Sequence, residues 1–66
     1  MHIILNGERL ELDTVVTVAG LLVSRGLAGR RVAVEVNGEI VPRGRHDSHE
    51  LADGDRVEIV HALGGG

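Results

Sequence analysis

Apolar and polar residues alternate along the first twelve positions, and an Asn-Gly pair interrupts the alternation. Residues 2–5 and 8–12 are therefore predicted to form two antiparallel strands. Asn6-Gly7 favours a two-residue type I′ turn, which needs positive φ at both positions and sets Ile3 opposite Leu10. One buried face is predicted to consist of Met1, Ile3, Leu5, Leu10 and Leu12.

The next apolar pattern has a helical period. Thr17 is a suitable N-cap, residues 18–25 are predicted to form a helix, and Gly26 stands where a C-terminal glycine commonly follows. The apolar stripe at i, i+3 and i+4 consists of Val18, Leu21 and Leu22. Gly20 is a poor helix former, and we expect close packing of the helix on a sheet to explain it. The β-branched run 15–18 also favours a strand, which is the competing interpretation.

A second hairpin is predicted from residues 31–36 and 39–41, joined by Asn37-Gly38. Pro42 cannot donate a ladder hydrogen bond, so it ends the second strand or marks a sheet edge. The buried face is predicted to hold Val32, Val34, Val36 and Val41.

The remaining residues add one loop and one strand. Residues 44–50 are polar and predict a loop, Leu51 is an isolated apolar anchor, and the turn at 53–55 leads into a strand over 56–60. One helix is thus available to cover one face of a four- or five-stranded sheet. The sequence predicts a single two-layer α+β domain over residues 1–66.

Composition narrows the possible functions. A chain of 66 residues has little room for a deep catalytic cleft. Without cysteine there is no disulfide or thiolate metal site. Without Phe, Tyr or Trp no side chain can stack on bases, so we expect no nucleic-acid partner. The arginines near 25–31 and 43–45 are expected to lie in solvated loops. No apolar run is long enough to span a bilayer and no signal peptide is recognised, so we expect a cytoplasmic protein.

Four histidines raise the question of a metal site. His46 and His49 are spaced i, i+3, whereas His2 and His61 lie elsewhere in the sequence. Metal sites need three or four ligands with supporting hydrogen bonds. We therefore expect solvated loop histidines, an edge-strand position for His61, and no metal.

The last six residues, 61–66, are predicted to form a flexible tail. It ends in three glycines, and glycine tolerates almost any backbone conformation, so the tail could thread a narrow channel. The residues predicted to enter a partner are Leu63, Gly64 and Gly65, and the reactive group is the carboxylate of Gly66. The alternative is an ordinary frayed end.

The order of these elements resembles the ubiquitin-like β-grasp fold, with a mixed sheet packed on one helix, and more narrowly the ThiS family of sulfur carriers. The resemblance covers the whole chain. The segments that carry it are residues 3–7, 17–22, 34–43, 51–59 and the terminal Gly65-Gly66. The family pattern ends in two glycines, whereas this chain ends in three.

The resemblance implies a carrier that is itself no enzyme. A ThiF-like adenylating enzyme would use ATP to convert the Gly66 carboxylate to an acyl-adenylate. Sulfur from a persulfide, supplied by a cysteine desulfurase, would then give a thiocarboxylate. Thiazole synthase (ThiG) would receive that sulfur for the thiazole of thiamine. No residue of the chain would be catalytic, and no cofactor would be bound.

Three alternatives stay open. The small subunit of molybdopterin synthase (MoaD-like) and carriers for tRNA thiolation share the tail and its chemistry. A non-catalytic β-grasp module would use its sheet surface to bind proteins. The sheet face opposite the helix, carrying Arg9, Glu11 and Arg56 or Glu58, is a candidate for binding the activating partner.

Overall fold

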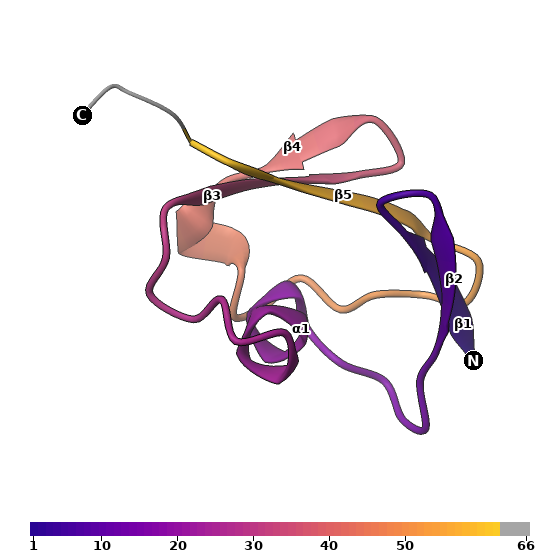
Figure 1. Ribbon diagram of the computed structural model, residues 1–66. Coiled ribbons are helices and arrows are strands. Elements are labelled where there is room, and N and C mark those ends of the chain that lie inside the picture. The colour runs from indigo at the N-terminus through magenta and orange to yellow at the C-terminus, as the bar shows by residue number, and fades with distance from the viewer. Residues whose placement is uncertain (63–66) are drawn as a thin grey trace.

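The structure is a computed structural model and describes residues 1–62. Its elements are β1 (His2–Leu5), β2 (Glu8–Glu11), α1 (Val18–Ser24), β3 (Val32–Val36), β4 (Glu39–Val41), the 3₁₀ helix η1 (Arg43–Arg45) and β5 (Arg56–His61). The strands form one five-stranded sheet in the order β2-β1-β5-β3-β4, and α1 packs on one face (Figure 1). The predicted two-layer α+β architecture is confirmed.

The β1–β2 hairpin follows from its turn residues. Asn6 and Gly7 have φ of 49° and 85°, as a type I′ turn requires. Ile3 lies opposite Leu10 in the predicted register. Two backbone hydrogen bonds extend the pairing beyond the strands, joining Met1 and Leu12 at 2.8 and 3.1 Å.

The β3–β4 hairpin has the same type of turn. Asn37 and Gly38 have φ of 52° and 86°, and Val34 lies opposite Val41. Strand β4 is an edge strand that ends at the residue before Pro42, as expected for a residue that cannot donate to a ladder.

Strand β5 is the central strand of the sheet, which no local pattern in the sequence indicated. It pairs in parallel with β1 at Ile4–Arg56 and Leu5–Val57. It also pairs antiparallel with all five residues of β3. The predicted edge-strand position for His61 is therefore wrong, and so is the start of the tail at residue 61, because His61 is the last residue of β5.

Two asparagine side chains attach the hairpin turns to β5. The Asn6 amide accepts from the Ile59 N–H at 2.8 Å and donates to the Ile59 carbonyl at 3.3 Å. The Asn37 amide accepts from the Arg56 N–H and donates to Asp55 Oδ1, both at 2.9 Å. Each asparagine thus has two roles: its backbone adopts the positive φ that the turn requires, and its side chain hydrogen-bonds to β5 or to the residue before it.

Helix α1 is closed by local contacts at both ends. Thr17 Oγ1 accepts from the Gly20 N–H at 3.0 Å, which confirms the predicted N-cap and rules out the competing strand. At the other end, Gly26 has φ of 73°, its N–H donates to the Val23 carbonyl, and the Leu27 N–H donates to the Leu22 carbonyl at 2.8 Å. These bonds form a Schellman motif.

The explanation expected for Gly20 is wrong. A Cβ there would lie 3.5 Å from Thr17 Oγ1 and 3.6 Å from Val16 Cβ, which is ordinary contact with the segment that enters the helix. Close packing against the sheet therefore does not require this glycine.

The core lies between α1 and the sheet face that meets it. Val18, Leu21 and Leu22 are buried, and so are the predicted inward residues of the central strands, Ile3, Val34 and Val57 among them. Leu51 is only 2% exposed, which confirms it as an anchor. The buried set is completed by Leu5, Val36, Val41 and Ile59, with Met1, Leu10, Leu12, Val16, Leu27 and Val32 packed against it.

Candidate functional site

The residues predicted to carry sulfur and to enter a partner, Gly66 with Leu63, Gly64 and Gly65, all lie outside the described residues. The residues that lead into them are held firmly: His61 pairs with Val32, and the Ala62 N–H donates to the Arg31 carbonyl at 3.0 Å. The tail thus follows directly from the central strand.

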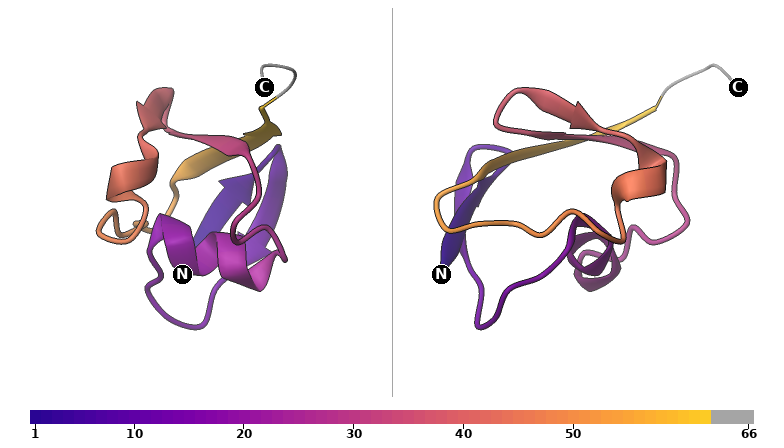
Figure 2. Two further views of the ribbon diagram at one scale, coloured as in Figure 1. Left: turned by 90° about the vertical axis from the view of Figure 1, so that its left-hand side faces the viewer. Right: turned by 180° about the vertical axis from the view of Figure 1, so that it is seen from behind.

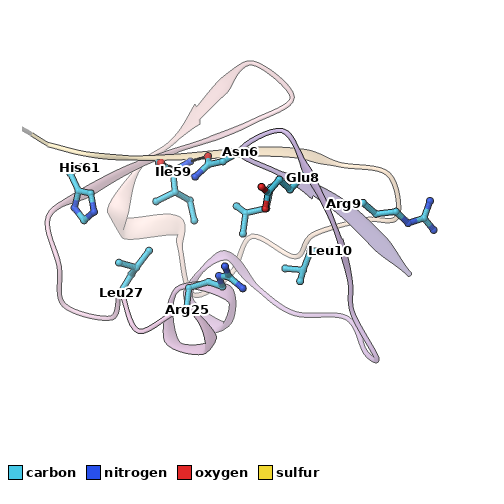
Figure 3. A pocket seen from close by; sticks show the side chains of 9 residues that line it. Asn6, Glu8, Arg9, Leu10, Arg25, Leu27, Ile59 and His61 are labelled. Atoms are coloured by element: carbon cyan, nitrogen blue, oxygen red, sulfur yellow. Dashed lines mark hydrogen bonds between the residues drawn. The ribbon is translucent and has the colours of Figure 1, made fainter.

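An open groove of about 500 Å³ adjoins the end of β5 (Figure 3). It lies between the β1–β2 hairpin, the end of α1 and the last residues of β5. Its lining includes Asn6, Leu10, Arg25, Leu27, Ile59 and His61. In an antiparallel pair, successive residues direct their backbone N–H and C=O groups alternately toward and away from the partner strand. Ala62 and Arg56 bond toward β3, so the backbone polar groups of Ile59 and His61 point away from β3 and toward this groove.

The titratable residues of this groove do not form a catalytic set. Glu8 and Arg9 belong to β2, Arg25 caps the end of α1 and His61 ends β5. Within residues 1–62 no hydrogen bond or ion pair joins any two of them. Arg9 instead donates to Glu11 at 2.7 and 3.0 Å. Acid–base or nucleophilic catalysis needs partners within hydrogen-bond reach, so this arrangement gives no basis for such chemistry.

Two carboxylates with a lowered pKa, those of Asp53 and Glu11, lie beside the start of β1. The start of β1 lies at the opposite end of the sheet from the end of β5 (Figure 1). The His2 backbone N–H donates to Asp53 Oδ1 at 2.7 Å and lowers the pKa of Asp53, with the nearby His2 side chain adding to the effect. Arg9 lowers the pKa of Glu11 through its hydrogen bonds. The contact of His2 with Asp53 joins β1 to the turn before β5, whereas the contact of Arg9 with Glu11 lies within β2. Both have a structural role.

The prediction of solvated loop histidines is wrong for His46. Its side chain is buried, and Nε2 lies 2.9 Å from the Val41 carbonyl oxygen. A carbonyl only accepts, so Nε2 carries a proton. The predicted loop at 44–50 in fact begins inside η1, whose turn brings His46 beneath β4. His49 is half-buried rather than solvated.

Loop residues near His46 also complete the N-terminus of α1. The Val18 and Ala19 N–H groups donate to the His49 and His46 carbonyls at 2.9 and 2.8 Å. The pattern of apolar and polar residues does not predict these two hydrogen bonds, because they depend on the path of a loop that is distant in the sequence.

Neither a metal centre nor a spanning helix is found in the described part of the chain. Among residues 1–62, no three His, Cys, Asp or Glu side chains come together as metal ligands. The one α-helix there, seven residues long, is too short to cross a bilayer.

The sheet order, the single covering helix and the central last strand define the ubiquitin-like β-grasp fold. Figure 2 shows the sheet, seen from two further sides, curving over α1. The crystal structure of the thiamine biosynthesis protein ThiS from Geobacter metallireducens superposes with a TM-score of 0.87 at 35% identity, with both chains covered completely. A solution structure of a thiamine biosynthesis protein from the same organism gives 0.79.

The sequence model of the ThiS family matches residues 3–66, and the chain belongs to this family. The sulfur carrier protein ThiS of Bacillus subtilis is 46% identical over 50 residues, which is 76% of each chain. Thiazole synthases of Paramagnetospirillum magneticum and Magnetococcus marinus are each 42% identical over all 66 residues. The chain spans only 20% of the length of these two longer relatives.

Proposed function

We propose that this chain is a sulfur carrier for thiamine biosynthesis, with the Gly66 carboxylate as the site that carries sulfur. The observation that carries the proposal is the match to the ThiS family over residues 3–66, which includes the glycines. The structure supports it, because the central strand β5 leads directly into Leu63, Gly64 and Gly65 and so gives the tail a rigid base.

The chemistry requires an activating partner. A carboxylate resists nucleophilic attack, since its leaving group would be oxide. We propose that a ThiF-like enzyme joins the Gly66 carboxylate to AMP from ATP and releases pyrophosphate. A persulfide sulfur, derived from cysteine by a desulfurase, attacks the acyl carbon and AMP leaves. Cleavage of the sulfur–sulfur bond by a thiol then leaves one sulfur on Gly66 as a thiocarboxylate.

In this proposal the chain acts as a co-substrate in the cytoplasm and not as an enzyme, and ATP is bound by its partner. The groove beside β5 supports this, since its charged residues are not joined to one another. The two relatives named thiazole synthase match the whole chain, which supports thiazole synthase as the acceptor of the sulfur.

Intact-mass spectrometry tests the proposal. The chain is incubated with ATP, the adenylating enzyme and a persulfide donor, and we expect a mass gain equal to the replacement of one oxygen by one sulfur. Deletion of Gly64, Gly65 and Gly66 should abolish the gain. The control is Gly20→Ala, a glycine of α1 where an added Cβ makes only ordinary contacts at 3.5 and 3.6 Å.

The acceptor is then identified by adding the purified thiocarboxylate to thiazole synthase or to the large subunit of molybdopterin synthase. Loss of the added mass only with thiazole synthase supports the thiamine pathway, and loss only with the other enzyme would reassign the pathway. Absence of any mass gain with an adenylating enzyme active on its own carrier would refute the carrier function. It would favour a protein-binding module instead.

A further inference from the structure

Arginines gather at the end of the domain from which the tail departs. We call this surface the arginine end and define it by Arg30, Arg31 and Arg43. It holds three of the seven arginines in a chain whose net charge is −3, whereas Arg25 and Arg45 line other grooves. The fold brings together two loops that are distant in sequence, since Arg43 Nη2 donates to the Arg30 carbonyl at 3.3 Å.

These three side chains are exposed, and none of them forms an ion pair within residues 1–62. Asp47 lines the same groove as Arg30 and Arg43 but lies more than 4.0 Å from their guanidinium groups. The ion pairs found within residues 1–62 join His2 to Asp53 and Arg9 to Glu11, and both lie toward the other end of the sheet. No carboxylate of the described chain comes within 4.0 Å of a guanidinium of the arginine end. Clustered charges of one sign create a potential that attracts a surface of the opposite sign.

A groove with an apolar floor lies within the arginine end. It has a volume of about 480 Å³ and runs between α1, the loop that follows it and η1. Its floor includes Leu22, Leu27 and Val32. Arg30 and Arg43 also line it, and Val23, which is 64% exposed, stands beside them. Arginine beside aliphatic surface is typical of protein interfaces, where arginine is enriched and supplies bidentate contacts to carboxylates.

The length of the tail decides which surface a partner must touch. The Ala62 N–H is bonded to the Arg31 carbonyl, so this part of the chain is fixed at the arginine end (Figure 2). Each further residue extends a chain by at most about 3.6 Å, so Gly66 reaches no more than about 14 Å beyond Ala62. An enzyme that acts on the Gly66 carboxylate must therefore press against the surface around Ala62.

We propose that the arginine end is the docking surface for an acidic patch of the adenylating enzyme, at the entrance of the channel that receives the tail. Aspartate and glutamate side chains of that patch pair with Arg30 and Arg43, and an apolar side chain enters the groove between them. The inference rests on the proposed function and adds the partner-binding surface to it.

Charge reversal at two positions tests the inference in the full chain. In Arg30→Glu/Arg43→Glu the cations that line the groove become anions. The matched control, Arg9→Glu/Arg56→Glu, changes the net charge equally but alters the sheet face opposite the helix. Far-UV circular dichroism establishes that both variants are folded. Carrier-dependent release of pyrophosphate gives KM and kcat, and titration calorimetry with the adenylating enzyme gives Kd.

We expect Arg30→Glu/Arg43→Glu to raise KM and Kd by about tenfold or more, because like charges then meet across the interface. The kcat should stay unchanged, because Gly66 is untouched. The control should stay within about twofold, as exposed charges outside an interface contribute little. Added salt should reduce the difference between wild type and Arg30→Glu/Arg43→Glu, since exposed charges are screened.

Several outcomes would overturn the inference. A loss confined to Arg9→Glu/Arg56→Glu would assign docking to the sheet face, and equal losses in both double variants would assign the effect to net charge alone. An unchanged KM and Kd in Arg30→Glu/Arg43→Glu would exclude the arginine end. Absence of wild-type binding to the adenylating enzyme would also overturn it. The proposed function fails separately: a wild-type chain that binds this enzyme through the arginine end but gains no sulfur would support the surface and refute the carrier chemistry.

Discussion

The side chain of Asn6 is predicted to stabilise the base of the tail. Asn6→Gly keeps the positive φ of the turn, because glycine adopts it freely, and removes the two hydrogen bonds to Ile59 at 2.8 and 3.3 Å. A net contribution of about 0.5–1.5 kcal/mol per hydrogen bond gives about 1–3 kcal/mol in total. Water in the adjoining groove replaces part of it, so we expect about 1–2 kcal/mol.

A matched control is available in the second hairpin. Asn37→Gly removes the same side chain from the same type of turn, but its bonds to Arg56 and Asp55 are exposed. Both variants share the cost of a more flexible unfolded chain, about 0.4–1 kcal/mol. The difference between them therefore isolates the Asn6 bridge, and we expect Asn6→Gly to lose about 1 kcal/mol more.

Urea unfolding followed by far-UV circular dichroism measures the loss, since the chain has no Trp or Tyr for fluorescence. For a domain of this size, each kcal/mol should lower Tm by roughly 4–8 °C. Hydrogen exchange gives a local readout, because the Ile59 N–H loses its acceptor only in Asn6→Gly. Equal destabilisation of the two variants, with Ile59 still protected in both, would refute the assigned role of Asn6.

Two further predictions concern stability. Leu21→Ala, at a position 1% exposed, should lower the free energy of unfolding in urea by about 2–5 kcal/mol. Val23→Ala on the same helix should change it by no more than about 0.5 kcal/mol. Equal losses in the two variants would contradict the packing of α1 on the sheet. The folded-state pKa of Asp53 is lowered, mainly by the His2 N–H, so its contribution is present at neutral pH and is lost as the pH falls below about 4. Asp53→Asn should therefore reduce the fall in Tm that accompanies acidification below about pH 4. Parallel curves of Tm against pH for wild type and variant would show that Asp53 does not cause this loss of stability.

Local signals in the sequence predicted the local structure correctly. Each Asn-Gly pair fixed a turn and a register, and Thr17 and Gly26 marked the ends of α1, because these choices depend on neighbouring residues alone. Alternation along β1, β3 and β5 also predicted which side chains are buried.

Features that depend on distant contacts were not predictable in the same way. Nothing near residues 56–61 indicates a central strand, since its place depends on pairing with β1, about fifty residues earlier. The burial of His46 follows from the turn of η1 under β4, and polar composition alone suggested a solvated loop. The arginines of residues 25–31 and 43–45 are indeed exposed, but only the fold shows that Arg30, Arg31 and Arg43 share one surface with Ala62.

The central position of β5 has a consequence for how the protein is made. Asn6 and Ile59 are 53 residues apart, and β1 and β3 meet only through β5. During translation the two hairpins and α1 can form early, but the sheet cannot close until residue 61 has left the ribosome. Pairing over such a separation also slows folding. A chain cut short before β5 would expose its unpaired strands to proteases and aggregation. The domain therefore becomes stable only when it also holds the strand from which its tail extends.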